Sequence, residues 1–428
     1  MNQPGRSKKF WLSLIIFSLI GQIAWVMENM YLNVFIYERF RASEDQIALM
    51  VAASAIAATL TTLLIGALSD KLGKRKLFIC GGYICWGVSI WSFALINMLS
   101  PAVAMTAASA ATGVTLVILT DCIMTFFGSA ANDAAFNAWL TDSTDQTNRG
   151  AAEGINSMMP MLAILVVFGG AMLMDQSNPS FWNVFFGIIG SVVLLLGILG
   201  FFLIDEPTVD TSENTSFFQN LIYGFRPSVI RENKTLFLTL PAYTAFGISI
   251  QIFMPYLILY YTVSLKMDNY VLIFAPAIVL AAIFTFFYGK LYDRFGFRIS
   301  IVPSLSLLMS GYLLLYFFRT TIPVFIGTLL MLCGYLSGMA VFGAMLRDHT
   351  PENRAGMFQG QRILAQVLIP GIIGPAIGAA VLKGAETIAN NDGTTSFVPN
   401  ANIFLAALIA TIAIWLVMIP LLKKKQRP

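Results

Sequence analysis

The sequence predicts an all-α membrane protein with twelve transmembrane helices in two similar halves. Three observations lead to this fold class. Of the 428 residues, 57% are hydrophobic and only 11% are charged, whereas a soluble protein carries about 25% charged residues. Apolar stretches of about 20 residues, the length that crosses a bilayer as a helix, recur along the whole chain. One charged turn sequence also occurs twice, half a chain apart.

Twelve apolar stretches are the expected helices, and short polar turns separate most of them. A helix satisfies its own backbone hydrogen bonds, which lipid requires of any single spanning segment. In chain order the stretches are 10–37, 46–68, 77–98, 111–140, 153–174, 181–204, 235–263, 269–290, 299–318, 321–346, 357–382 and 402–422. The Ala- and Ser-rich stretch 98–112 is compatible with a loop or with an early start of the fourth helix.

The longest polar stretch, Asp205 to Lys234, lies between the sixth and seventh helices and contains an amphipathic piece, Phe217 to Arg231. We interpret it as a cytoplasmic linker. The expected organisation is therefore an N-terminal six-helix bundle (1–204), the linker (205–234) and a C-terminal six-helix bundle (235–428), related by pseudo-two-fold symmetry.

The repeated turn sequence runs from Gly66 to Arg75 and again from Gly289 to Arg298. A second, weaker repeat places an Asp and an Arg after the fourth and tenth helices. We expect these polar groups to form a latch whose bonds exist in one conformational state and break in another; a turn that only carries topology charges is the alternative. The predicted gating residues are Gly66, Asp70, Gly73, Arg75, Asp142, Arg149, Asp293, Arg298, Asp348 and Arg354.

The distribution of basic residues predicts the orientation. With the N-terminus inside, all but five of the 26 Lys and Arg residues fall on cytoplasmic segments, as the positive-inside rule requires. Both ends are then cytoplasmic, and the expected location is the cell membrane, inner or plasma. The net charge of +4 gives no reason to expect nucleic acid as a partner.

The sequence contains no pattern typical of an enzyme or of a metal site. The sole histidine, His349, falls in an expected polar loop. The four cysteines, Cys80, Cys85, Cys122 and Cys333, lie in apolar stretches without metal-ligand or disulfide spacing. No phosphate-binding loop of the type G-x-x-x-x-G-K-[ST] occurs, so no ATP-driven engine is visible. We expect no cofactor and no catalytic residue.

The repeated turn resembles the signature of the major facilitator superfamily, which lies between helices II and III and recurs in degenerate form between VIII and IX. Within it, the stretches Met30–Tyr37 and Asp133–Trp139 resemble the glycoside–pentoside–hexuronide cation symporters, the melibiose permease group. That resemblance implies a sugar or glycoside as substrate. Sodium-coupled members carry two acids in helix II, at positions where this chain has Ala58 and Thr62. They also carry a Lys in helix XI, at about the position where this chain has Gln366. Proton coupling, or none, is therefore favoured over sodium coupling.

Three carboxylates inside apolar stretches are the predicted cation or proton coupling residues: Asp133, Glu28 and Asp121. An ionisable group within the bilayer is costly and is by default a functional candidate. Polar residues recur at every fourth position of the fourth helix, from Asp121 to Thr141, and we expect Ser129, Asp133 and Asn137 to share one face lining a central cavity. The alternatives are hydrogen bonding between helices and, for Glu28, a structural pair with a neighbouring hydroxyl or amide.

Amides suit a sugar-like solute because they hydrogen-bond hydroxyl groups in both directions. In the first helix the spacing of three amides predicts a common face. Tyr260 and Tyr261 are expected to be anchors at the membrane surface. The predicted substrate-binding residues are Gln22, Asn29, Asn33, Ser129, Asn137, Gln251, Gln361, Arg362 and Gln366.

Together these patterns predict a secondary active transporter that works by alternating access. Its expected partners are a small-molecule substrate, a proton or another cation, and the lipid bilayer, and we expect a monomer. The alternatives are a proton-coupled exporter, a carrier of other small metabolites, or a non-transporting membrane sensor. Three carboxylates within the membrane argue against the last.

Overall fold

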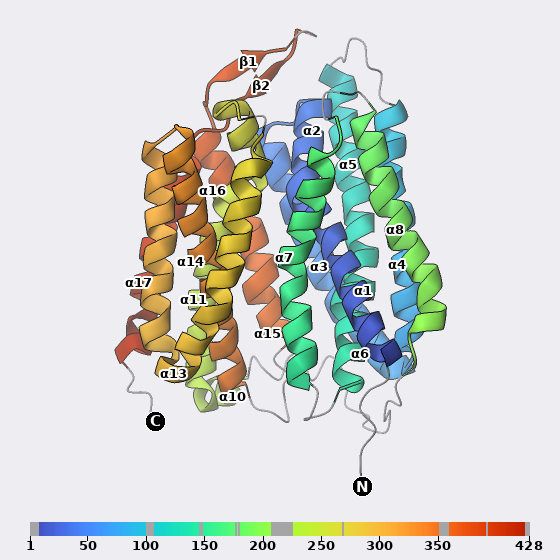
Figure 1. Ribbon diagram of the computed structural model, residues 1–428, viewed down its shortest axis with the longest axis vertical. Coiled ribbons are helices and arrows are strands. Elements are labelled where there is room, and N and C mark those ends of the chain that lie inside the picture. The colour runs from blue at the N-terminus through green and yellow to red at the C-terminus, as the bar shows by residue number, and fades with distance from the viewer. Residues whose placement is uncertain are drawn as a thin grey trace. The chain divides into compact units, whose positions relative to one another are not determined.

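The computed structural model describes residues 8–99, 107–144, 149–175, 178, 180–206, 226–267, 269–350, 359–390 and 393–423. Within these residues, twelve helices are long and apolar enough to cross a membrane, which confirms the twelve expected spans. Figure 1 shows that the described chain is helical apart from one short hairpin, β1–β2. Contacts divide the chain into two compact units.

The N-terminal unit comprises Met1–Ala42, Ala53–Asn214 and Ala389–Thr395. Its helices are α1 (Lys8–Val26), η1 (Met27–Leu32), α2 (Asn33–Phe40), most of α3 (Glu44–Leu72), α4 (Arg75–Leu99), α5 (Ala107–Gly128), η2 (Ser129–Phe136), α6 (Asn137–Asp142), α7 (Arg149–Met172) and α8 (Phe181–Leu203).

The C-terminal unit comprises Ser43–Ala52, Thr215–Ile388 and Ser396–Pro428. Its helices and strands are α10 (Pro227–Glu232), α11 (Lys234–Phe253), η3 (Met254–Tyr256), α12 (Leu257–Leu259), η4 (Tyr260–Ser264), α13 (Val271–Phe317), α14 (Thr321–His349), α15 (Gln359–Ile363), η6 (Leu364–Leu368), α16 (Ile369–Leu382), β1 (Thr387–Ala389), β2 (Thr395–Phe397) and α17 (Asn402–Lys423).

Three stretches differ from the simplest expectation. The fourth span begins at Ala107, inside the ambiguous stretch 98–112, whose residues 100–106 lie outside the described part. The amphipathic piece Phe217 to Arg231 is described only from residue 226, where α10 begins at Pro227, a residue favoured in a first helical turn. The hairpin β1–β2 was not predicted, because strands of three residues leave too short an alternation to detect.

Four spans contain a π-helical segment, in which the wider turn replaces the α-helical hydrogen-bond ladder. These segments are η1 in the first span, η2 in the fourth, η4 in the seventh and η6 in the eleventh. None was predicted from the sequence. Such segments are rare and occur frequently at functional sites, and η1 and η2 hold two of the three predicted coupling carboxylates, Glu28 and Asp133.

The two copies of the repeated turn share one backbone feature. Gly73 and Gly296, which occupy the same place in each copy, have φ angles of 62° and 72°. Gly73 directly follows α3, and Gly296, with ψ −177°, bends α13 near the start of the ninth span. Residues with a Cβ atom rarely adopt a positive backbone φ angle. The glycine shared by the two copies therefore reflects a chain reversal that only glycine makes without strain.

Small residues allow helices within each unit to pack closely. In the N-terminal unit, a Cβ added to Gly87 of α4 would lie 2.5 Å from the backbone nitrogen of Leu194 of α8. In the C-terminal unit, a Cβ on Gly378 of α16 would lie 2.3 Å from the carbonyl oxygen of Ile252 of α11. Because lipid supplies no hydrophobic drive for helix association, such close van der Waals contact is what holds transmembrane helices together.

Substituting alanine for Gly73 or Gly296 should destabilise the protein. A residue with a Cβ in a left-handed conformation costs about 1–2 kcal/mol, and the extended positive-φ region of Gly296 is essentially restricted to glycine. We expect both variants to unfold at lower temperature than the parent in detergent, with the larger loss for Gly296→Ala. Thermal unfolding followed by tryptophan fluorescence measures the difference.

Gly66 and Gly289, from the same two motif copies, provide matched controls. A Cβ on Gly66 would meet only Ala134 Cβ at 4.0 Å, and one on Gly289 would meet nothing within 4 Å. Alanine at either position should leave the unfolding temperature unchanged or raise it slightly. Equal losses at all four glycines would contradict the backbone explanation.

Candidate functional site

Three carboxylates lie inside the N-terminal unit, on the first and fourth spans. Glu28 in η1 is 7% exposed, and Asp121 in α5 is 2% exposed. Asp133 in η2 is half-buried. Burying a charge without compensation is expensive, so the neighbours of each carboxylate decide what it does.

Glu28 and Asp121 belong to one cluster built from three spans. The hydroxyl of Thr125 donates to Glu28 Oε1 at 2.9 Å, and the hydroxyl of Ser54 on α3 donates to Asp121 Oδ2. Asp121 and Thr125 are four residues apart on α5, so their side chains lie on nearly the same face. The second oxygens, Glu28 Oε2 and Asp121 Oδ1, are buried and accept no hydrogen bond from the described residues.

Asp133 has different surroundings. Its Oδ2 accepts a hydrogen bond from Ser129 at 3.0 Å, and the Asn137 amide donates to the Asp133 backbone carbonyl rather than to its carboxylate. Ser129 is buried whereas Asn137 is exposed. Exposure alone does not give the direction of a side chain, so the common face of these three residues along a central cavity stays a prediction. The facing angles assumed an α-helix, and from Ser129 onwards the π-helical segment η2 changes them.

Neighbouring helices approach η2 very closely. A Cβ on Gly21 of the first span would lie 2.1 Å from the amide nitrogen of Asn132, and a Cβ on Gly82 of α4 would lie 2.6 Å from Ala131 Cβ. Asn132 is buried and its side-chain nitrogen has no hydrogen-bond partner among the described residues. The wide turn that carries Asp133 is thus enclosed by glycine-lined neighbours on two sides.

The amides of the first span do not share one environment. Asn29 is exposed, Gln22 is half-buried and Asn33 is 1% exposed. The Asn29 amide donates to the Trp25 carbonyl, and that of Asn33 donates to the Asn29 carbonyl, each at 2.8 Å. The hydrogen bond from Asn33 connects two of the amides across one turn, and the common face of all three stays a prediction. The π-helical segment η1 lies between Gln22 and Asn33 and changes the facing angles of an ideal α-helix.

In the C-terminal unit, Gln361 is buried, and Gln251, Arg362 and Gln366 are half-buried. Gln251 packs against α16, because a Cβ on Gly374 would lie 2.4 Å from its Cβ. Gln366 lies within η6. Gln361 also lines a mostly apolar groove of about 460 Å³, whose other walls include Phe237, Leu240, Pro241, Thr244, Ala245, Leu364 and Ile369.

Several predicted gating residues meet in the first copy of the motif. The buried Arg75 donates through Nε to Asp142 Oδ2 at 3.0 Å and through Nη1 to the Ser69 hydroxyl at 2.6 Å. Ser69 in turn donates to the Gly66 carbonyl at 3.0 Å. This chain of hydrogen bonds connects the end of α3, the start of α4 and the end of α6.

The second copy is built differently. Arg298 is exposed, and Asp348 accepts a hydrogen bond from the Tyr292 hydroxyl instead of from Arg298. Arg298 lies on an exposed side of α13, so the second copy has no counterpart of the Arg75–Asp142 pair among the described residues. The side chains of Asp70, Asp293 and Arg149, and the whole of Arg354, lie outside the described residues.

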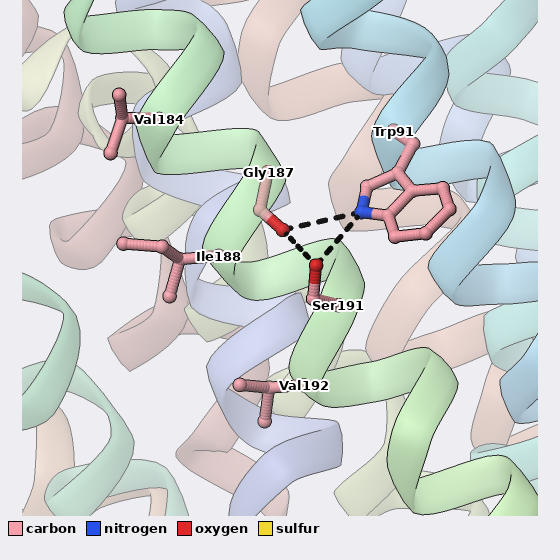
Figure 2. Close-up of a pocket in the computed structure, with 6 residues that line it drawn as sticks. All are labelled: Trp91, Val184, Gly187, Ile188, Ser191 and Val192. Atoms are coloured by element: carbon pink, nitrogen blue, oxygen red, sulfur yellow. Dashed lines mark hydrogen bonds between the residues drawn. The ribbon is translucent and has the colours of Figure 1, made fainter.

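A second groove, between α4 and α8, is not a candidate site. It measures about 550 Å³ and contains none of the predicted functional residues. Figure 2 shows that the Trp91 indole donates to the Gly187 carbonyl and to the Ser191 hydroxyl, each at 3.2 Å. Its remaining walls, Val184, Ile188 and Val192, are apolar. Its polar groups thus satisfy one another.

Sequence reasoning missed Ser54 as a partner of Asp121, because a single Ser in an Ala-rich helix forms no pattern. It also misplaced Tyr260 and Tyr261. Both are buried in the C-terminal unit rather than exposed at a membrane surface, and their hydroxyls contact the Leu315 carbonyl and Thr328. His349 lies at the end of α14, with Nδ1 hydrogen-bonded to the Met345 carbonyl, and not in a loop.

Three comparisons relate the chain to known proteins. The profile described as Major Facilitator Superfamily matches residues 10–375. No curated protein matches the sequence. Among solved structures, a variant of the nucleoside transporter NupG has a TM-score of 0.72 at 13% identity, with 96% of this chain and 99% of that chain covered.

Two further solved structures share the fold. A bacterial homologue of the human lysosomal transporter Spinster, in an inward-facing and occupied conformation, has a TM-score of 0.70 at 16% identity, covering 99% of this chain and 100% of that one. The xylose transporter XylE from E. coli, in a partially occluded inward-open conformation, has a TM-score of 0.69 at 14% identity, covering 98% and 100%.

The profile match spans most of the chain, and the twelve membrane-spanning helices agree with it. The chain therefore belongs to the Major Facilitator Superfamily: it is a multi-pass membrane protein with the major facilitator fold and a secondary active transporter rather than an enzyme.

Proposed function

We propose that this transporter moves a small polar organic solute, of the sugar or glycoside class, together with protons, and that Asp133 is the coupling carboxylate. The observation that carries the proposal is the setting of Asp133. It is half-buried on a membrane-spanning helix, its carboxylate has one hydroxyl partner, Ser129, and no ion pair holds it within the described residues. A carboxylate that is neither locked in an ion pair nor fully enclosed is free to gain and lose a proton.

The π-helical segment η2 supports this role. A wide helical turn places Asp133 off the α-helical register and leaves the Asn132 amide without a partner. A buried polar group without a partner is costly and calls for an explanation, of which a functional role is one.

The substrate class follows from resemblance and from residue chemistry. The stretch Asp133–Trp139 resembles the melibiose permease group, and half-buried amides such as Gln22, Gln251 and Gln366 suit hydroxyl-rich solutes. XylE, one of the structural neighbours, is a xylose transporter. We also propose that both termini are cytoplasmic and that residues 1–204 and 235–428 are the two moving bundles.

We further propose that Arg75 and Asp142 form a latch. A buried guanidinium that reaches both Asp142 and Ser69 connects three helix ends, so it stabilises the conformation in which those ends are together. Breaking these hydrogen bonds would shift the population toward the conformation in which the three helix ends are apart.

Asp133→Asn should abolish uphill accumulation while sparing counterflow exchange. Asparagine keeps the shape and hydrogen bonding of the side chain but cannot carry a proton. The measurement is radiolabelled substrate uptake into proteoliposomes, with a proton gradient for accumulation and with preloaded substrate for exchange. Asp175→Asn, an exposed acid outside the spans, should behave like the parent. Full accumulation by Asp133→Asn would refute the coupling role.

A panel of sugars, glycosides, nucleosides and organic acids should separate the substrate classes. A ligand that binds only the folded state stabilises it by about 2.7 kcal/mol at one hundred times its Kd. We expect a sugar or glycoside to raise the unfolding temperature in detergent, and nucleosides and organic acids to leave it unchanged. A shift confined to one of the latter two classes would replace the sugar assignment.

Arg75→Gln and Asp142→Asn should slow transport without removing substrate binding. Hydrogen bonds to charged groups contribute about 1.5–3 kcal/mol, and losing one from a single conformational state corresponds to a tenfold or larger change in population. Initial uptake rate and the ligand-induced thermal shift are measured in parallel. The exposed neighbour Lys74→Gln is the control. A double variant with the charges exchanged, Arg75→Asp with Asp142→Arg, should recover transport. If it does not, the two side chains do not form a direct latch.

A further inference from the structure

We infer that Glu28, Asp121, Thr125 and Ser54 form a binding site for a small monovalent metal cation, Na⁺, separate from Asp133. The first observation is the composition of the cluster. Two carboxylates and two hydroxyls from three spans meet in the N-terminal unit, and the hydrogen bonds that organise them run from Thr125 to Glu28 and from Ser54 to Asp121. All the side-chain polar atoms are oxygens, which are the ligands that hard cations prefer.

The second observation is that each carboxylate has one oxygen with nothing to bind. Glu28 Oε2 and Asp121 Oδ1 are buried and accept no hydrogen bond from the described residues. Glu28 and Asp121 are 7% and 2% exposed, so both side chains are more than nine-tenths buried. A buried acceptor without a partner carries a desolvation penalty, and in native structures it points to an ion or water.

The two unsatisfied oxygens belong to neighbouring side chains. Thr125 donates to Glu28 and lies one turn from Asp121 on α5, so Glu28 is held beside the part of α5 that carries Asp121. Within the described residues no hydrogen bond joins Glu28 to Asp121. The two carboxylates therefore share no proton in this structure, and a bound metal cation is the compensation that we infer.

The number of ligands favours a monovalent ion. Ca²⁺ takes six to eight oxygen ligands, and Mg²⁺ keeps several of its waters. Only two carboxylate oxygens of the cluster, Glu28 Oε2 and Asp121 Oδ1, have no hydrogen bond to the described residues, which is fewer than the ligands that Ca²⁺ takes. The four side chains are only 1–8% exposed, so little water reaches the cluster to complete the shell of a divalent ion. Within the described residues no basic side chain forms an ion pair with Glu28 or Asp121. A cation therefore supplies the compensating charge that the protein itself does not.

The site is distinct from the proposed coupling residue. Asp133 binds Ser129 and lies within η2, three turns along the fourth span from Asp121. It is also distinct from Thr62, whose buried hydroxyl lies two turns from Ser54 on α3 and has no partner among the described residues. Because ion binding is measured without transport, failure of the site would leave the coupling role of Asp133 untouched, and the reverse also holds.

The test is thermal unfolding of the full-length purified protein in detergent, titrated with NaCl at constant ionic strength against choline chloride, with KCl, MgCl₂ and CaCl₂ in parallel. We expect a saturable rise in unfolding temperature with Na⁺. Equilibrium binding of ²²Na⁺ to the same samples provides a second measurement. Glu28→Gln and Asp121→Asn should abolish both signals, and Ser54→Ala should weaken Na⁺ binding roughly tenfold.

Two matched variants make the assignment specific. Asp175→Asn removes an exposed carboxylate of the same unit, and Thr62→Val removes a buried hydroxyl of the same helix as Ser54, so both should bind Na⁺ as the parent does. Should Glu28→Gln or Asp121→Asn fail to fold, the milder Ser54→Ala and Thr125→Val decide. Three results would overturn the Na⁺ site. They are the absence of both a Na⁺-specific thermal shift and bound ²²Na⁺, a thermal shift with divalent ions only, and a stabilisation that depends on pH alone. Loss of Na⁺ binding in Thr62→Val but not in Ser54→Ala would also show that the proposed ligand set is wrong.

Discussion

The cost of placing charge in lipid is the constraint on which the rest of this molecule depends. The bilayer offers no water to a buried carboxylate, so each of the three acids in the N-terminal unit requires a hydrogen-bond donor from the protein. Thr125 and Ser54 supply one hydroxyl each to Glu28 and Asp121, and Ser129 supplies one to Asp133. Those bonds in turn determine which faces of the first, second and fourth spans meet.

The same constraint explains the unequal treatment of the three carboxylates. Glu28 and Asp121 are almost fully enclosed, and each keeps one unsatisfied oxygen, whereas Asp133 is half-buried beside a single hydroxyl. An enclosed pair suits an ion that stays dehydrated while bound. A partly open carboxylate suits a proton that must enter and leave. One helix thus presents two electrostatic environments, separated by the start of the π-helical segment η2.

Sequence patterns predicted the helices well because the requirement they express is local. A stretch of about 20 apolar residues must form a helix in lipid, whatever its neighbours do, and the glycine spacing of the repeated turn predicted the reversals at Gly73 and Gly296. The facing of individual side chains is harder to predict from sequence patterns. The faces of Asn33 and Asn137 were predicted with ideal α-helical angles, and the π-helical segments η1 and η2, which no sequence pattern revealed, change those angles. Tyr260 and Tyr261 look like surface anchors in sequence, yet Leu315 and Thr328, distant in the chain, provide their buried partners.

The two copies of the repeated turn show how one backbone plan acquires different chemistry. Both copies reverse the chain at a glycine with positive φ, so this shared element is conformational. The side chains then diverge: Arg75 is buried and bonded to Asp142 and Ser69, while Arg298 is exposed and Asp348 is bonded to Tyr292. A charged bond shielded from water is stronger than one at an exposed position. For this reason the proposed latch is assigned to the N-terminal copy, which belongs to the same unit as all three membrane carboxylates.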